Sequence, residues 1–422
     1  MDRLRLKSII GGSAGNLVEW YDWYAYASLS LYFAPVFFPK GDPTAQLLNT
    51  AGIFAAGFFM RPVGAWYMGR FSDRHGRKTG LALSVGLMAL GSLLIACAPG
   101  YASVGVFAPA LLLLARMIQG FSVGGEYGSS ATYLSEMAPR KARGFWSSFH
   151  YVSIVLGQLL SLAVLLVLQF TLGEAALAAW GWRLPFVIGA VLALAVFVLR
   201  RNIAETASFT VQAAERPVST ARNLWRDHPR EFMLVAGITA GGSLAFYAYT
   251  TYLQKFLVNT SGFAKPVATA VMTLALAVFL LMQPAFGALA DRFGRKPMLL
   301  TFGVGTTLAT VPVFTALASE TSPVSAFALI MLSYALLACY TSITALIKAE
   351  LFPAHIRTLG VALPYALGNA LFGGTAEYAA LWFKGAGVEA AFYWYVAAMA
   401  AVATACFALL PETSKTSLIL ED

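Results

Sequence analysis

Ionisable residues inside otherwise apolar stretches are the residues of this sequence best suited to chemistry. The first half of the chain holds five of them, Glu19, Asp22, Arg61, Arg116 and Glu126. A charge at bilayer depth costs a few kcal/mol unless it is paired or hydrated, so such residues are functional candidates by default. Counted from the start of each apolar stretch, Asp22, Arg61 and Arg116 lie about 18 to 21 Å along their helices. We therefore expect all three near the middle of a membrane.

These types of side chain indicate a site that binds a carboxylate and moves a proton. Arg61 and Arg116, with Gln119, are the candidates for binding, because a guanidinium can fork onto a carboxylate through paired charge-assisted hydrogen bonds. The candidates for the proton are Asp22, then Glu19, then Glu126 in GGEYG. A static ion-pair cluster that locks the helices together is the alternative reading of the same residues.

Tyr26 shares one helical face with Glu19 and Asp22, and we include it among the substrate candidates. The second half of the chain has fewer charges in its apolar runs and more polar aromatic residues. A membrane tyrosine is more often an interfacial anchor than a ligand contact. One run nevertheless has three tyrosines within six residues, followed by a lysine. The candidates taken from the second half are Tyr249, Tyr252, Lys255 and Lys348. Arg183 in WGWRLPF either guards the outer mouth or anchors the interface.

A polar turn of the form G-x-x-x-D-R-x-G-R-K ends two apolar runs, at 69–78 and at 287–296. Glycine permits a tight reversal, an aspartate complements the start of the following helix, and the basic residues hold a loop on the cytoplasmic side. A second repeat, E-x-x-P-x-x-x-R, occurs at 136–143 and 350–357. Duplicated turns of this kind predict two similar halves.

Composition limits the class of protein. Of the 422 residues, 59% are hydrophobic and only 12% are charged, against about 25% charged in soluble domains. The net charge of +9 comes without a basic stripe or a nucleic-acid motif, so we expect no nucleic-acid partner. Three cysteines in apolar runs and four histidines without ligand spacing predict neither a metal site nor a cofactor. No catalytic constellation favours an enzyme.

The apolar runs predict an all-α membrane protein with twelve spans in two six-helix bundles. The expected spans are 9–38, 47–69, 79–98, 104–135, 144–169, 183–199, 232–258, 266–290, 298–318, 324–347, 358–383 and 388–410. The predicted domains are an N-terminal bundle at 1–199, a linker at 200–231 that has room for a short surface helix, and a C-terminal bundle at 232–422. Most lysines and arginines fall on one side of this arrangement, which predicts that both termini are cytoplasmic.

The two signature turns resemble those of the major facilitator superfamily. The stretches GNLVEWYDWYAYASLSLYF, AGFFMRPVGAW and RMIQGFSVGGEYGSSATYLSE resemble its metabolite:proton symporter branch. That branch includes permeases for α-ketoglutarate, citrate, shikimate and proline or betaine. The stretches FYAYTTYLQKFLVNTSG, YTSITALIKAELFPAHIRTLGVAL and GNALFGGTAEYAAL are most similar to the α-ketoglutarate permeases of the branch.

The resemblance implies charge networks that form a cytoplasmic gate. It places Asp73, Arg77, Glu136 and Arg143 in one network. Gly69 begins the turn that contains Asp73 and Arg77, and we include it with the gate. It places Asp291, Arg295, Glu350 and Arg357 in the mirror network. The alternative is that these residues merely position loops by snorkelling.

The expected function is import of α-ketoglutarate, or a similar small carboxylate, with protons by alternating access between the two halves. The expected setting is a monomer in a bacterial inner membrane. Other substrates of the same branch remain as alternatives: citrate, shikimate, and proline or betaine. A membrane sensor that binds a metabolite without moving it is a rival of another class.

Overall fold

The computed structural model describes residues 3–75, 77–124, 126–201 and 220–419, and helices are the only regular elements in these ranges. The first half contains α1 (Arg3–Phe37), α2 (Pro43–His75), α3 (Arg77–Cys97), α4 (Tyr101–Val104), α5 (Phe107–Val123), α6 (Glu126–Met137), η1 (Arg140–Ala142), α7 (Arg143–Ser147), α8 (Phe149–Ala179), η2 (Gly181–Arg183) and α9 (Leu184–Arg201). The second half contains α11 (Ala221–Asp227), α12 (Pro229–Tyr247), η3 (Ala248–Tyr252), α13 (Leu253–Asn259), α14 (Lys265–Phe293), α15 (Arg295–Ala318), α16 (Pro323–Thr341), α17 (Thr344–Glu350), α18 (Arg357–Gly368), η4 (Asn369–Gly373), α19 (Ala376–Gly385), α20 (Ala390–Leu409) and α21 (Thr413–Thr416).

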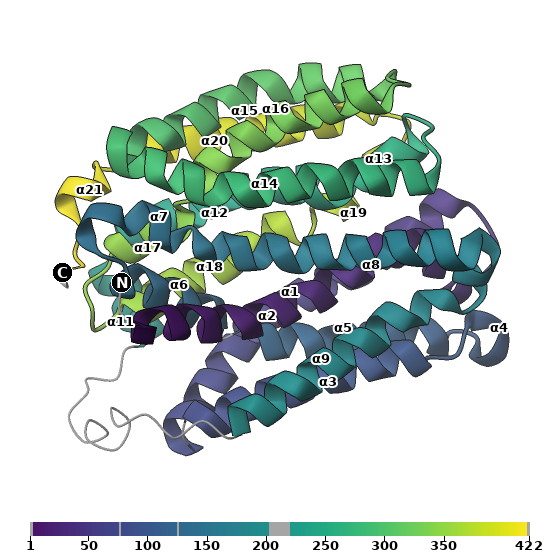
Figure 1. Cartoon of the computed structure of the whole chain (residues 1–422), viewed down its shortest axis with the longest axis horizontal. Coiled ribbons are helices and arrows are strands. Elements are labelled where there is room, and N and C mark those ends of the chain that lie inside the picture. Colours follow the sequence, from purple (N-terminus) through teal and green to yellow (C-terminus); the bar gives the residue numbers. More distant parts are fainter. Residues whose placement is uncertain (1–2, 76, 125, 202–219, 420–422) are drawn as a thin grey trace.

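Most of these helices run lengthwise through the molecule, side by side (Figure 1). Some follow one another along a single predicted span, as α5 and α6 do, or α16 and α17. Grouped in this way, the described helices form twelve segments at the predicted places. Seven helices of the described ranges are long and apolar enough to cross a membrane by length and composition alone. The short helix α11 lies within the predicted linker.

The two bundles pack against each other along a shared face, and one cluster of buried apolar residues extends through both. In the first half α1 packs on α8, α2 on α5 and α3 on α9; in the second half α20 packs on α12 and α15. Between the halves, α14 packs on α7 and α8, α18 on α6, and α19 on α2. One close crossing between the halves pairs Gly144 with Gly287, where a Cβ on either residue would lie 2.4 Å from the other's carbonyl oxygen. Only glycine lets these two backbones approach so closely.

Two helices of the second half contain π-helical turns, η3 and η4, which no pattern in the sequence predicted. Such turns insert a residue into the helix and are frequent at functional sites. Here each lies on a helix that faces the first half, since η3 packs near α1 and η4 packs on α2. They set the angular position of the side chains that follow, including Lys255 and Glu377.

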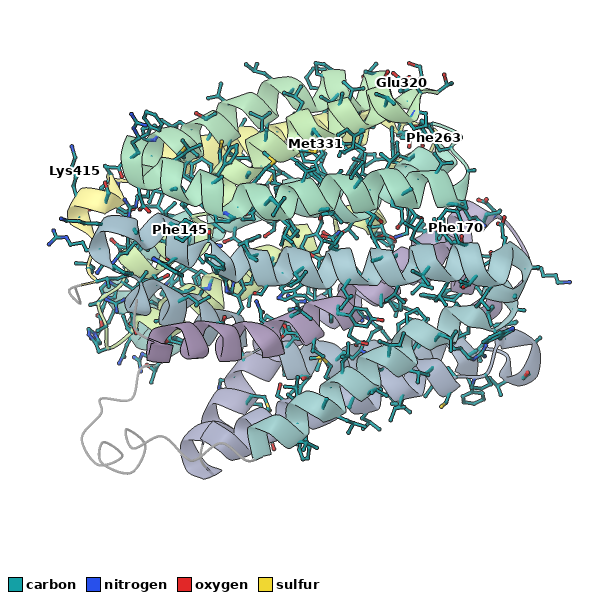
Figure 2. The ribbon with its side chains drawn as sticks, viewed as in Figure 1. Phe145, Phe170, Phe263, Glu320, Met331 and Lys415 are labelled. Carbon is teal, nitrogen blue, oxygen red and sulfur yellow. The ribbon has the colours of Figure 1, made fainter. Side chains whose placement is uncertain are left out.

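The molecule has two ends that are easily told apart. The start of α1 lies with α11 and α21 at one end, which we call the termini end (Figure 1). Phe145 and Lys415 mark this end in Figure 2, and Phe170, Phe263 and Glu320 mark the opposite end. Arg143 begins α7, which lies at the termini end, and Arg183 follows α8, which ends at the opposite end (Figure 1).

Candidate functional site

Two buried arginines share an aromatic surround in the middle of the first bundle. Arg61 on α2 is 3% exposed, and Arg116 on α5 is fully buried. The Arg116 guanidinium carbon lies 3.8 Å from the centre of the Trp23 ring, and the Arg61 carbon lies 4.3 Å from the same ring. Phe58 lies 4.2 Å from Arg61, and Tyr26 lies 4.5 Å from Arg116. Cation–π contact therefore stabilises both charges by an amount on the order of 1–2 kcal/mol each.

A hydrogen-bond chain connects Arg116 to Asp22 through Gln119. Arg116 Nη1 donates to Gln119 Oε1 over 2.7 Å, and Gln119 Nε2 donates to Asp22 Oδ2. The same amide lies 3.1 Å from Ser92 Oγ. Gln119 is one turn further along the same helix as Arg116, and its side chain lies between Arg116 and Asp22. Asp22 and Arg116 can thus influence each other without forming a direct ion pair.

Both guanidiniums keep donors that the rest of the described chain does not use. Among the described residues, Nε and Nη2 of Arg61 and of Arg116 have no hydrogen-bond partner. A buried donor without a partner costs about 1–3 kcal/mol, and more when it carries charge. A carboxylate that accepted from these atoms would remove that cost, and its planar pair of oxygens matches the guanidinium fork. This is the arrangement expected of an anion-binding site.

The other acids of the first half are placed less completely. Glu19 is buried on α1, one turn before Asp22. Glu126 begins α6, but its side chain lies outside the described residues. Tyr26 donates from its hydroxyl to the carbonyl oxygen of Thr50 over 3.0 Å. Its ring therefore contacts Arg116 while its polar atom is already engaged.

Lys348 and two stacked tyrosines lie where the bundles meet. Tyr127 on α6 and Tyr365 on α18 stack with ring centres 3.4 Å apart and planes 5° apart. Lys348 Nζ lies 4.6 Å from the Tyr365 ring and 5.6 Å from the Tyr127 ring. Arg61 borders a narrow cavity of about 10 Å³ together with the same two tyrosines. Lys348 and Arg61 were candidates from the sequence, but the stacking of the two tyrosines between them was not predicted.

Lys255 belongs to a different cluster, nearer the opposite end. Its Nζ donates to Glu377 Oε2 and to the carbonyl oxygen of Ala27, each over 2.8 Å. Ala27 is on α1, so this lysine of the second bundle is bonded to the first. Tyr249 and Tyr252 have polar partners within the second bundle: the Tyr249 hydroxyl lies 2.7 Å from Thr310 Oγ1, and the Tyr252 hydroxyl donates to Glu389.

Contacts of Asp291 join the bundles at the termini end. Its two carboxylate oxygens accept from the backbone N–H groups of Gly144 and Phe145, over 2.8 and 2.9 Å. Arg295 Nη2 lies 3.4 Å from Asp291 Oδ1 and 3.7 Å from Glu350 Oε1. An aspartate of the second signature turn thus caps the first turn of α7 in the other bundle, which is favourable because that end of a helix is positive.

Arg357 and Arg143 contact partners that the repeat did not predict. Arg357 pairs with Glu136 of the first bundle rather than with the mirror network of its own half. Arg357 Nη2 also donates to the carbonyl oxygen of Leu418 over 2.7 Å, and Arg143 Nη1 donates to that of Ile419 over 3.2 Å. The C-terminal segment therefore contacts predicted gate residues of both bundles. The side chains of Asp73 and Arg77 lie outside the described residues, and Gly69, which has no side chain, lies near the end of α2.

Glu412 fixes this segment to the start of α15. Its carboxylate accepts from the backbone N–H groups of Arg295 and Lys296 and from Ser414. Burial acts to raise the pKa of Glu412, but these hydrogen bonds outweigh burial and hold the pKa below its usual value. The charge of Glu412 is thus secured near neutral pH.

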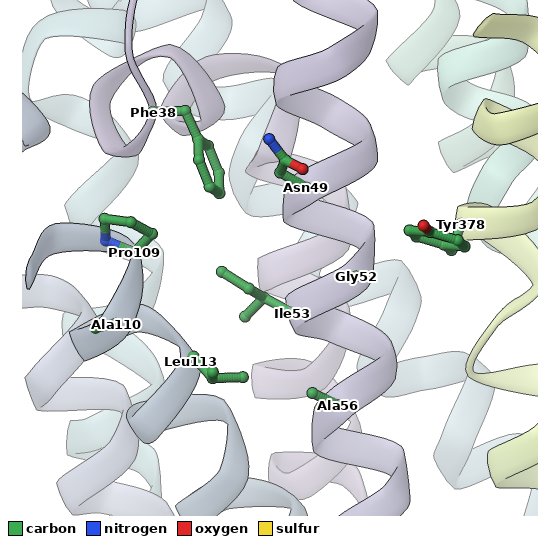
Figure 3. Close-up of a pocket in the computed structure, with 9 residues that line it drawn as sticks. All are labelled: Phe38, Asn49, Gly52, Ile53, Ala56, Pro109, Ala110, Leu113 and Tyr378. Carbon is green, nitrogen blue, oxygen red and sulfur yellow. The ribbon is translucent and has the colours of Figure 1, made fainter. Parts of the chain in front are cut away.

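Two further features lie away from the arginines. Arg183 donates from Nη2 to the carbonyl oxygen of Ala98 over 3.0 Å and stacks on Trp182, within the first bundle. A hollow of about 470 Å³ opens beside α2 and α5, and Figure 3 shows Ile53 and Leu113 pointing into it. Its lining residues are Phe38, Asn49, Gly52, Ile53, Ala56, Pro109, Ala110, Leu113 and Tyr378. Because none of these residues is charged, the hollow does not suit a carboxylate.

Two helical bundles that meet around buried charges define a secondary membrane transporter. The sequence comparison gives the family: the model of the Major Facilitator Superfamily matches residues 23–376, so the chain belongs to that superfamily. The all-α, twelve-helix, two-bundle fold predicted from the sequence is thereby confirmed. In a comparison of folds, a partially occluded, inward-open structure of the E. coli xylose transporter XylE covers 97% of this chain and 99% of its own. The TM-score is 0.80 at 17% identity, which bears on the fold alone.

Several curated relatives align over nearly the full length. The chain is 54% identical to the alpha-ketoglutarate permease of Escherichia coli, over 95% of this chain and 92% of the relative. It is 34% identical to a citrate-proton symporter of Salmonella typhi, over 87% and 85% of the two chains. It is 31% identical to a glycine betaine/proline/ectoine/pipecolic acid transporter of Dickeya dadantii, over 90% and 77%. These relatives place the chain in the branch that its motifs predicted.

Proposed function

We propose that this protein imports α-ketoglutarate together with protons. The single observation that carries the proposal is the pair Arg61 and Arg116, buried beside one tryptophan with guanidinium donors left for a carboxylate. The likeness to an alpha-ketoglutarate permease supports the choice of substrate. In this proposal Gln119 completes the carboxylate site and Asp22 carries the proton, with Glu19 and Glu126 as the next candidates.

The surroundings of the arginines argue against a betaine or proline carrier. Recognition of a quaternary ammonium uses an aromatic cage. The aromatic faces of Trp20, Trp23 and Phe58 are already in contact with the guanidinium of Arg61. The ammonium group of a betaine or proline placed there would meet two positive charges, whereas a dianion without an ammonium group is attracted by both.

The proposed cycle places the substrate between the bundles, which then rock about it. We assign the termini end to the cytoplasm and the protein, as a monomer, to the bacterial inner membrane. The gate then consists of Asp291, Arg295, Glu350, Arg357, Glu136 and Arg143, with Gly69, Asp73 and Arg77 of the first turn. Lys255 with Glu377 would hold the outer side. Tyr249, Tyr252 and Arg183 would support the helices rather than touch substrate.

Counterflow in proteoliposomes tests this function. Vesicles loaded with unlabelled α-ketoglutarate should take up labelled α-ketoglutarate. Citrate, shikimate, proline and betaine, added outside, should inhibit this uptake only weakly. Exchange of citrate but not of α-ketoglutarate would show that the protein transports a different substrate of the same branch. Binding without any exchange would favour a sensor and refute transport.

A further inference from the structure

Lys348 has a charge that no described acid balances. It is fully buried on α17, and its Nζ has no hydrogen-bond partner among the described residues. Lys255 is equally buried, but its ammonium has both a carboxylate and a carbonyl oxygen as acceptors. Cation–π contact with the tyrosine faces beside Lys348 offsets only part of what a buried, unpaired ammonium costs. The position therefore favours an anionic ligand.

The tyrosine pair connects this lysine to the arginine site. Both rings border the narrow cavity beside Arg61, and both also lie within 5.6 Å of Lys348 Nζ. Tyr127 belongs to the first bundle, whereas Tyr365 and Lys348 belong to the second. Movement of one bundle away from the other would separate the stacked rings and open a path from Arg61 to Lys348.

We infer that Lys348 binds the second carboxylate of the substrate, so that one dicarboxylate bridges the two bundles. The 2-oxo carboxylate lies at Arg61 and Arg116, whose forked donors suit its adjacent oxygens, and the distal carboxylate lies at the point charge of Lys348. His150 assists, because its ring lies 4.8 Å from Tyr127 and its Nε2 has no partner in the described part of the chain. This inference rests on the proposed function and names the residue that selects dicarboxylates over monocarboxylates.

Calorimetric titration with two matched ligands tests the assignment. The ligands are α-ketoglutarate and 2-oxopentanoate, which has a methyl group in place of the distal carboxylate. Lys348→Met should weaken α-ketoglutarate binding roughly 10- to 100-fold, the range expected for a hydrogen bond between charged groups. Binding of 2-oxopentanoate should change less than about threefold, because that ligand makes no bond to Lys348. An equal loss for both ligands, or no loss for either, would overturn the inference.

Two controls separate this result from other failures. Lys384→Met removes a lysine that pairs with Glu389 near the opposite end, and it should leave both affinities unchanged. Lys348→Arg retains a cation and should retain the preference for the dicarboxylate. The Lys348→Met variant should elute from size exclusion as the wild type does, since methionine fills the site without a buried charge. If the wild type itself bound no α-ketoglutarate, the proposed function would fail first, and this inference with it.

Discussion

At the scale of single residues, the site is defined by which polar atoms already have partners. Arg116 donates a hydrogen bond from one nitrogen to Gln119, and the Gln119 amide donates in turn to Asp22. Arg61 relies on aromatic faces, with Nε and Nη2 left without a partner among the described residues. The positions of these residues were predictable, because charges in apolar runs are conspicuous. Their pairing was not, because the sequence does not show how each helix is rotated about its axis.

The first prediction concerns the geometry of the guanidinium fork. Arg61→Lys and Arg116→Lys retain the positive charge but lose the planar pair of donors. Each should weaken α-ketoglutarate binding by roughly tenfold or more, equivalent to about 1.5 kcal/mol. Calorimetry measures this directly. Wild-type affinity in both variants would remove the two arginines from the binding site.

The second prediction concerns the proton. Asp22→Asn retains an acceptor for Gln119 but cannot gain or lose a proton. Accumulation driven by a pH gradient should be abolished, while energy-independent counterflow continues. Uptake against a gradient is measured in proteoliposomes with the interior made alkaline. Accumulation at the wild-type level would show that Asp22 does not carry the proton, and Glu19, Glu126 and Glu377 would be the next candidates.

At the scale of elements, the sequence predicted where helices lie better than how they are built. A membrane span needs about 20 apolar residues, so runs such as 266–290 and 298–318 predicted α14 and α15 closely. The π-helical turns at Tyr249 and Asn369 correspond to no pattern in the sequence, since they depend on packing between helices. The resemblance to the superfamily placed Arg357 in a charge network of its own half. Only the docked bundles show that it binds Glu136 instead.

The third prediction concerns the helix cap that joins two elements. Asp291→Asn loses the charge that caps α7 and puts an amide N–H where the second carboxylate oxygen accepted from Phe145. The contact at the termini end should weaken by about 1 kcal/mol or more. Transport should slow, while α-ketoglutarate affinity stays within about threefold of wild type, because the cap does not contact the substrate site. Turnover in counterflow gives the measurement. Asp227→Asn on α11, where the acid pairs with its exposed neighbour Arg226, is the matched control.

At the scale of the whole molecule, contacts join the bundles at both ends. Asp291 and Glu136 lie at the termini end, and Lys255 binds Ala27 toward the other. Alternating access requires one set of contacts to break while the other holds. The internal repeat predicted this two-part design, but which contacts close each side depends on the relative placement of the halves.

The fourth prediction concerns net charge across the membrane. α-Ketoglutarate is a dianion at neutral pH, and moving one charge across 100 mV changes the energy by about 2.3 kcal/mol. An inside-negative potential would oppose import with one proton, because one net negative charge would enter. Import with two protons moves no net charge, so the potential would not affect it. We expect at least two protons, so an imposed inside-negative potential should not slow uptake. Slower uptake under that potential would contradict this coupling.

The crowding of two guanidiniums around Trp23 has an optical consequence. Indole emission shifts with the electric field across the ring, and here that field comes from charges within 4.3 Å. An arriving carboxylate would neutralise part of the field, so the protein carries its own fluorescent reporter of occupancy. Titration with α-ketoglutarate should shift the emission of the wild type, and Trp23→Phe should remove most of the shift although eight other tryptophans remain from a total of nine. An unaltered shift in that variant would place the responding indole elsewhere.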